Sequence, residues 1–346
     1  MKKIIGMDLG DKKNVMVVLD ETGKEIEVSS CINTAKNIQK YFSRYKDCVV
    51  VMEAGTHSAW IGRSLTKMGH EVHVGNPRKL RAIWDTDDKS DKRDARVLAL
   101  MYRLEPRLLH EVFHRSEEAQ MDLELIKARN QLVESRSKLI NHVRGAVKGV
   151  GQRLSKCSAE CFARRARECL PGNLKASLSS MLDVIEHLTE QIRLQDRRIE
   201  EISIKKYPET KYLRQVPGVG PITALAFVLT LETPERFGKS RVAGAFLGLT
   251  PRRDQSGDTD KQLRITKAGN TYMRQLLISC AHYILGPFGP DSDLRFYGQR
   301  IAARGGKNAK KRAVVAVARK LAVLLHRLWI TKDTYVAIGF KESNVA

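Results

Sequence analysis

Acidic residues are scarce in this sequence relative to basic ones. Its 39 Asp and Glu face 61 Lys and Arg, which gives a formal net charge of +22. Long apolar runs are also missing, because no stretch reaches the ~18 residues that span a bilayer and no signal-peptide core is visible near the N-terminus. These absences argue against a membrane protein. We therefore expect a cytoplasmic protein with no membrane partner.

The cysteines form no regular framework. There are six in the chain, and no two occur as a C-x-x-C pair. Cys157, Cys161 and Cys169 lie near one another in a basic segment, but their spacing fits no common zinc finger. We interpret all six as reduced intracellular thiols, and a zinc site at these three is the disfavoured alternative.

The positive charge points to an acidic partner. For a protein without an amphipathic membrane helix, nucleic acid is the most common such partner. The charge fits an enzyme and a non-catalytic scaffold equally well. At 346 residues the chain is long enough for two or three domains.

The first hundred residues alternate between strand and helix patterns. Three short strand-like runs separated by turns predict an antiparallel meander. The run from Cys48 to Met52, which ends at Glu53, is continuously apolar and therefore predicts a strand buried on both faces. The expected strands are residues 3–8, 14–19, 25–28, 48–52 and 71–74, with helices at 35–45, 57–68 and 92–104. This order fits an α/β domain of the ribonuclease H type.

The pattern changes near residue 116. Leucine-spaced, highly charged segments predict two long helices, interrupted between Gly149 and Gly172, which pair as an antiparallel hairpin or a coiled coil. A third, mainly α-helical region begins near Pro208. It includes an apolar helix at residues 222–230 and a basic helix at 309–329. The expected domains are 1–115, 116–207 for a helical linker and oligomerisation region, 208–335, and a tail at 336–346.

Four carboxylates in the first region suggest a metal site. Asp8 and Glu53 end two strands expected to be neighbours, while Asp91 and Asp94 lie three residues apart at the start of a helix. Carboxylates at a helix start are often only caps, so helix capping is the alternative for that pair. Asp85, Asp87 and Asp88 are interpreted as solvated loop residues. A divalent cation would reconcile an acidic pocket with a phosphate-binding surface.

Two glycines precede the apolar helix at 222–230. Gly218 and Gly220 lie in a Pro-Gly-Val-Gly turn of the helix-hairpin-helix form, whose backbone N–H groups grip phosphate without reading sequence. A plain helix-opening turn is the alternative.

Ser256 lies before a glycine in a basic stretch that we expect to be a loop. Most such serines are turn residues, but cations here could orient a phosphate and stabilise the charge that develops during attack. These cations are Arg252, Arg253, Lys261, Arg264 and Lys267.

A one-sided run of charge lies near the C-terminus. Between Arg295 and Lys332 there are eleven Lys or Arg and no acidic residue, and we expect this run, with Lys310, Lys311 and Arg312, to follow a nucleic-acid backbone. Tyr297 is a candidate for base stacking, whereas Trp329 is expected in the core.

The four acids, the long-helix middle and the Gly-Leu-Thr-Pro, Gln-Ser-Gly and Thr-Lys-Ala-Gly-Asn blocks together resemble the DEDD-type insertion-sequence transposases, described as bridge-RNA-guided recombinases. The likeness extends from Met7 to about Trp329. It implies a prokaryotic, nucleoid-associated protein with a domain similar to the RuvC Holliday-junction resolvase. In that domain Asp8, Glu53, Asp91 and Asp94 bind Mg²⁺.

The resemblance further implies that Ser256 is the nucleophile of a C-terminal transposase domain and forms a phosphoserine link to DNA. The acidic site of another protomer completes the active centre. The implied partners are donor and target DNA, a structured bridge RNA that pairs with both, and a tetramer built from two dimers.

Three other functions stay open. The first is a metal-dependent Holliday-junction-type endonuclease in which Ser256 is structural. The second is a non-catalytic RNA-binding scaffold. The third is a sugar-kinase-like ATPase, which is disfavoured because no second phosphate loop or adenosine motif is visible.

Overall fold

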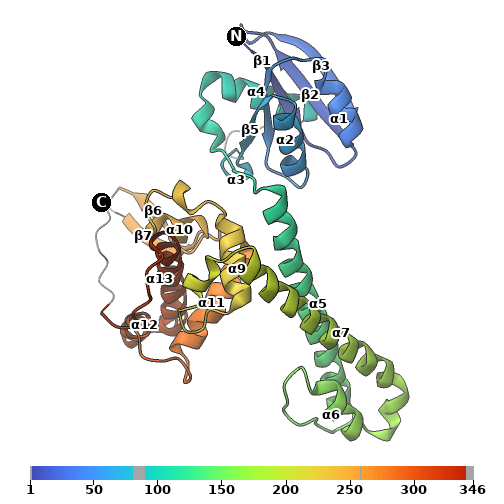
Figure 1. Ribbon diagram of the computed structural model, residues 1–346, viewed down its shortest axis with the longest axis vertical. Coiled ribbons are helices and arrows are strands. Elements are labelled where there is room, and N and C mark those ends of the chain that lie inside the picture. Colours follow the sequence, from blue (N-terminus) through green and yellow to red (C-terminus); the bar gives the residue numbers. More distant parts are fainter. Residues whose placement is uncertain (1, 81–89, 258, 340–346) are drawn as a thin grey trace. The chain divides into compact units, whose positions relative to one another are not determined.

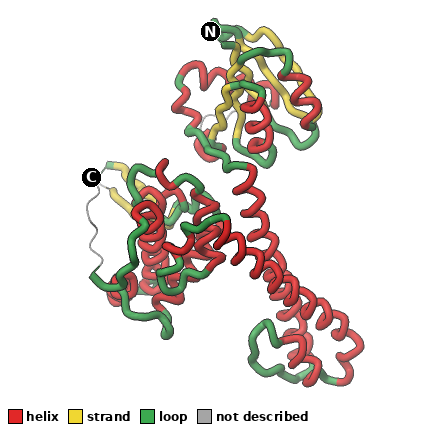
Figure 2. The backbone as a smooth tube through the Cα atoms, viewed as in Figure 1, coloured by secondary structure: helices red, strands yellow, loops and turns green. Residues whose placement is uncertain are grey.

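The computed structural model describes residues 2–80, 90–257 and 259–339. The chain divides into two compact units, Met1–Glu117 and Glu118–Ala346. The strands gather in the first unit, and the second contains one β-hairpin among many helices (Figures 1 and 2).

The first unit is built on a five-stranded sheet in the order β3-β2-β1-β4-β5. The first three strands are antiparallel, and β4 and β5 run parallel to β1. This mixed α/β arrangement is consistent with a ribonuclease H-like fold, as predicted. The strands are β1 (Lys3–Asp8), β2 (Lys13–Leu19), β3 (Glu25–Ile32), β4 (Cys48–Glu53) and β5 (Glu71–Gly75).

Helices cover both faces of this sheet (Figure 1). The helices α1 (Ala35–Phe42) and α2 (Ser58–Lys67) pack against alternate strand residues such as Met7 and Met52. The helix α4 (Asp91–Leu104) packs against the opposite set, including Ile4 and Val51. The strand β4 is therefore buried on both faces, which confirms the prediction from its continuous apolar run. Two short elements complete the unit, α3 (Pro77–Leu80) and the 3-10 helix η2 (Pro106–Leu109).

The second unit begins with a pair of long helices. The helix α5 (Glu117–Gly149) and the helix α7 (Gly172–Lys205) lie side by side in Figure 1. They are antiparallel, because Arg129 bonds to Asp196 while Arg136, further along α5, bonds to Thr189, earlier in α7. The short helix α6 (Phe162–Cys169) closes a small core at one end of the pair.

The rest of this unit surrounds a larger core. The helix α9 (Pro221–Leu231) is buried along almost its whole length. Trp329, near the end of the helix α13 (Ala309–Thr331), packs against Phe227, which confirms that Trp329 is a core residue. The remaining elements are α8 (Thr210–Leu213), η3 (Pro234–Arg236), α10 (Arg241–Phe246), β6 (Pro251–Ser256), β7 (Thr259–Ile265), α11 (Thr271–Leu285) and α12 (Asp293–Ala303).

We expected a loop around Ser256, and this prediction is wrong. These residues form an antiparallel hairpin, with Pro251 opposite Ile265 and Ser256 opposite Thr259. Two residues separate its strands, and Gly257 at a φ of 52° occupies the left-handed region that tight hairpin turns need. Every residue of β6 is exposed. Because neither face of β6 is buried, its sequence lacks the alternation of apolar and polar residues that usually indicates a strand.

No helix among the residues that the structure describes is both long and apolar enough to cross a bilayer.

Candidate active site residues

Asp8 and Glu53 lie at the same edge of the sheet. The strands β1 and β4 are parallel and pair Met7 with Met52, so the next residue of each strand is one of these two acids. Gly6 and Val51, two positions earlier, face α4, and side chains alternate along a strand. Asp8 and Glu53 therefore belong to the α4 face, and both are half-buried.

Asp91 and Asp94 occupy the first turn of α4. The Ser90 side chain caps this helix by accepting a bond from the backbone N–H of Arg93. The backbone of Ala95, the residue after Asp94, lies against Gly6, where an added Cβ would come within 1.8 Å of the Ala95 carbonyl oxygen. This close approach brings the start of α4 over the part of β1 that leads to Asp8.

Among the described residues, no three acidic, histidine or cysteine side chains are grouped closely enough to hold a metal ion. The topology thus pairs Asp8 with Glu53 and directs α4 toward them. A four-carboxylate site stays a prediction. Asp85, Asp87 and Asp88 lie outside the described residues.

Ser256 is exposed at the end of β6, next to the hairpin turn. Residues directly opposite share one face of an antiparallel pair, so Ser256 and Thr259 lie on the same face as the neighbouring pair, Asp254 and Lys261. The hydroxyl is thus accessible to a large substrate, with Lys261 and Asp254 on its face of the hairpin.

Arg253 does not lie on that face. Its guanidinium forms two bonds to the Asp260 carboxylate, at 2.7 and 2.6 Å, and this pairing lowers the pKa of Asp260. Arg253 therefore links the two strands of the hairpin through an ion pair, whereas we expected it to contact phosphate. The other expected cations of this stretch, Arg252, Lys261, Arg264 and Lys267, are exposed.

The base of the hairpin is fixed by backbone contacts. Gly248, at a φ of 70°, lies so close to Ala268 that an added Cβ would come within 2.3 Å of its backbone nitrogen. The buried guanidinium of Arg274 donates to the carbonyl oxygens of Leu247 and Gly269, at 3.3 and 3.1 Å, and also to that of Ala268. Our prediction did not include Arg274. The signal for it was that Arg274 is the one Lys, Arg, Asp or Glu residue within α11.

A large groove lies in the second unit. It has a volume of about 1790 Å³ and is bordered by β7, α12, α13 and the segment after η3. Nine of its lining residues are Lys or Arg and two are acidic. Lys311 and Arg312 line it, as do Arg264 and Lys267 from the Ser256 hairpin, whereas Lys310 is not among the lining residues.

Comparison with known proteins identifies the family. A DEDD transposase model of the IS110 type matches residues 5–151, and a model described as the transposase IS116/IS110/IS902 family matches residues 210–295. A putative transposase of Sinorhizobium fredii, y4rJ, is 30% identical over 313 residues, which cover 82% of this chain and 77% of the relative. The chain belongs to the IS110 family of transposases.

Other relatives agree over more of the chain. The transposase for insertion sequence element IS1111A of Coxiella burnetii is 28% identical over 341 residues, covering 96% of this chain and 91% of the relative. The transposase for IS1328 of Yersinia enterocolitica is 25% identical over 319 residues, covering 89% of this chain and 87% of that protein. The chain is therefore an enzyme that moves DNA, as predicted.

The glycine turn of this transposase has a packing explanation at one position. Gly218 has a φ of 89°, and an added Cβ would lie 2.6 Å from the Tyr283 ring. Gly220 opens α9 and has open space around the position of a Cβ. The preceding helix, α8, has only four residues, shorter than a typical helix-hairpin-helix partner. A phosphate contact at this turn stays a prediction.

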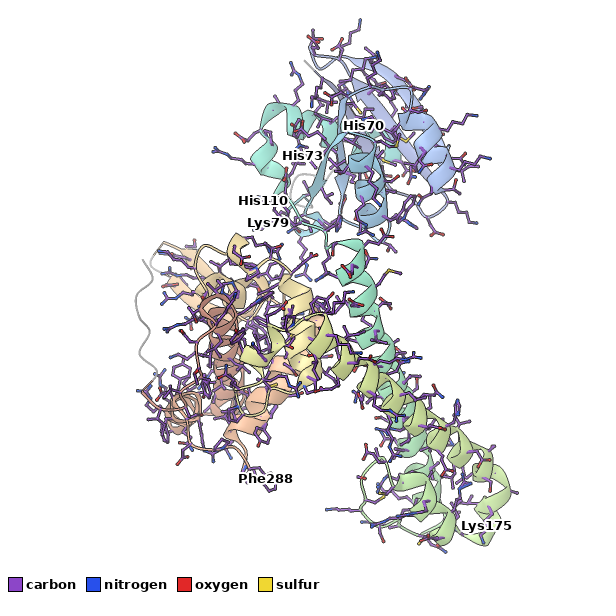
Figure 3. The ribbon with its side chains drawn as sticks, viewed as in Figure 1. His70, His73, Lys79, His110, Lys175 and Phe288 are labelled. Carbon is purple, nitrogen blue, oxygen red and sulfur yellow. The ribbon has the colours of Figure 1, made fainter. Side chains whose placement is uncertain are left out.

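Our prediction also did not include a charged network in the first unit of the transposase. His73 of β5, labelled in Figure 3, contacts Glu71 through Nε2 at 2.9 Å and Glu111 through Nδ1. The hydrogen bond from His73 lowers the pKa of Glu71, which also accepts a bond from the Tyr102 hydroxyl at 3.1 Å. The network ties the edge strand to α4 and to the segment after η2.

Proposed function

We propose that this transposase cuts and rejoins DNA through a phosphoserine formed at Ser256. The observation that carries the proposal is the placement of the Ser256 hydroxyl. It stands exposed beside a tight turn, and Arg274 holds the base of its hairpin. A nucleophile that attacks a duplex backbone needs this combination of accessibility and fixed geometry.

The proposed step exchanges one phosphate ester for another. The Ser256 oxygen bonds to the phosphorus, its proton passes to a base, and the bond from phosphorus to one deoxyribose oxygen breaks. The released oxygen takes up a proton and becomes a free hydroxyl. Religation reverses these changes with the hydroxyl of a different strand, so no external energy source is needed.

We further propose that Asp8, Glu53, Asp91 and Asp94 hold Mg²⁺. Carboxylate oxygens are the ligands that this hard cation prefers, and the neighbouring strand ends of Asp8 and Glu53 supply a starting pair. A bound Mg²⁺ would neutralise charge on the phosphate under attack. The four side chains would also orient the cation, because Asp8 and Glu53 stand on a sheet and the other two on a capped helix.

Guidance by a bridge RNA and assembly as a tetramer complete the proposal. The net charge of +22 supports binding of nucleic acid. In this proposal the acids of one protomer and the Ser256 of another, which belong to different compact units of the chain, form each active centre together.

The test is to trap a covalent adduct between the full-length protein and labelled donor DNA in the presence of bridge RNA and Mg²⁺. We expect an adduct that resists denaturant with the unaltered protein and none with Ser256→Ala. Thr259→Ala is the matched control, since it removes the hydroxyl directly opposite on the hairpin. It should still form the adduct.

A metal-dependent endonuclease without serine catalysis is the second candidate, favoured by the strand-end pair of Asp8 and Glu53. It requires that Ser256→Ala cut DNA as well as the unaltered protein does, with no adduct in either case. That result would exclude the phosphoserine.

A further inference from the structure

The groove in the second unit combines two kinds of surface. Its cations include Lys311, Arg319 and Lys320 of α13, and apolar side chains such as Val315 and Val323 line it between them. Along α13 the two kinds alternate with each helical turn, so the basic positions recur every eight residues, or about 12 Å. Along α13 the groove therefore has positively charged positions separated by apolar positions.

Within the described residues, three cations of the groove are not neutralised by an acidic side chain. In the described parts of the chain, Lys311, Arg264 and Arg319 form no ion pair with a carboxylate. Lys320 instead lies over the ring of Tyr297, with its nitrogen 4.4 Å from the ring centre. Clustered cations repel one another, and a bound polyanion would relieve that repulsion.

We propose that this groove binds a nucleic-acid strand whose bases are unpaired. A duplex presents phosphates and sugars to a groove of this kind, and burying phosphates on apolar side chains costs desolvation energy. An unpaired strand can place its phosphates on the cations and its base faces on the apolar steps. Tyr297 is half-buried in the groove wall, and a base can stack on its ring by displacing the Lys320 nitrogen that lies over it.

The proposal rests on the proposed function, because it says which kind of nucleic-acid strand binds next to the proposed nucleophile. Arg264 belongs both to the Ser256 hairpin and to the lining of the groove. A guide RNA can pair with DNA only where the strands of both are unpaired, so a protein that uses such a guide meets unpaired strands. The two ideas fail separately. Ser256 is not among the lining residues, so Ser256→Ala should bind unpaired strands as the unaltered protein does.

Fluorescence anisotropy of the full-length protein tests the inference. The probes are oligothymidylate and oligouridylate of about 12 nucleotides, within the site size of known single-strand grooves, and a duplex of the same length. Tyr297→Ala should weaken binding of the unpaired probes by about 5- to 150-fold, as expected for one lost stacking contact, and leave the duplex nearly unchanged. Tyr297→Leu, which keeps the apolar packing, should give the same selectivity.

Lys311→Gln should weaken binding of the unpaired probes and reduce the salt slope by about 0.7, the value for one phosphate contact on a single strand. Lys175→Gln is the charge-matched control, on an exposed residue of α7 that is labelled in Figure 3. It should leave the affinity unchanged. Tighter binding of uridylate would assign the groove to RNA, and tighter binding of thymidylate to DNA.

Three results would overturn the inference. One is equal loss of duplex and unpaired binding in both Tyr297 variants. A second is Lys311→Gln behaving like Lys175→Gln. The third is Lys311-dependent binding of an acidic amphipathic peptide without binding of either oligonucleotide, which would make the groove a protein-docking site.

Discussion

At the scale of single residues, His326 connects two segments that are distant in sequence. Its side chain is fully buried in α13, with Nδ1 3.0 Å from the Ser240 hydroxyl and Nε2 3.0 Å from the Pro234 carbonyl oxygen. The Phe237 ring packs edge-on against it. Burial lowers the pKa of His326 below its usual 6.5 because the charged imidazolium would lose its hydration.

This shift predicts a loss of stability in mild acid. The folded-state pKa is depressed, so the unfolded chain binds protons first, and the contribution of neutral His326 is lost as the pH falls from 6.5 toward the folded-state pKa. We expect the urea midpoint of the second unit to fall between about pH 6.5 and 5 in the unaltered protein. In His326→Gln this pH dependence should be shallower.

The exposed His187 of α7 supplies the control for that measurement. His187→Gln should keep the pH dependence of the unaltered protein. An unchanged slope in His326→Gln would contradict the prediction.

At the scale of elements, the contact between α4 and β1 positions the acids. Because Gly6 has no Cβ, the Ala95 carbonyl can lie directly against the β1 backbone. The backbone of Ala99 also lies close to Gly6. Small residues on both elements thus bring the helix down onto the sheet. Asp91 and Asp94 lie in the same helix, so the depth of this contact sets their distance from Asp8 and Glu53.

Gly6→Ala should therefore lift α4 from the sheet. We expect a destabilisation of about 1–3 kcal/mol, typical of overpacking, together with loss of DNA cleavage. Chemical denaturation and a cleavage assay measure the two effects. Full cleavage by Gly6→Ala would show that the position of α4 is unimportant.

Gly145→Ala is the control for a change of the same chemistry. Gly145 is exposed near the C-terminal end of α5, with nothing within 4 Å of an added Cβ. Because alanine favours a helix over glycine, this variant should be more stable by about 0.5–1 kcal/mol and should keep its activity.

At the scale of the whole molecule, the two halves of the proposed active centre lie in separate compact units. Asp8 and Glu53 belong to the first and Ser256 to the second. If protomers share active centres, one inactive variant can supply the half that another lacks.

Mixing Asp8→Asn with Ser256→Ala therefore tests the shared centre. Each variant alone should be inactive. In a mixed assembly, one centre combines the intact acids of one protomer with the intact serine of the other, so adduct formation should return to a fraction of the unaltered level. No recovery, with mixed assemblies verified by differential tags, would place both halves of each centre in one protomer.

Local sequence patterns by themselves determined much of the first unit. The continuous apolar run before Glu53 required a strand buried on both faces, because both of its side-chain sets need cover. The apolar spacing of Ala95 and Leu98 fixed which side of α4 faces the sheet. Asp8 and Glu53 could be expected at one edge of the sheet because each is the last residue of a strand and the two strands were expected to be neighbours.

The tertiary structure decided what depends on contacts between distant segments. The hairpin of Ser256 has no apolar alternation to reveal it, and the tie between Arg253 and Asp260 follows from strand register rather than from charge. The groove likewise gathers residues from Glu235 to Ala337, and which cations of a basic run line it depends on the rotation of α13. Sequence patterns record which side of an element prefers water, whereas the partner that each side chain meets is set only when the elements pack.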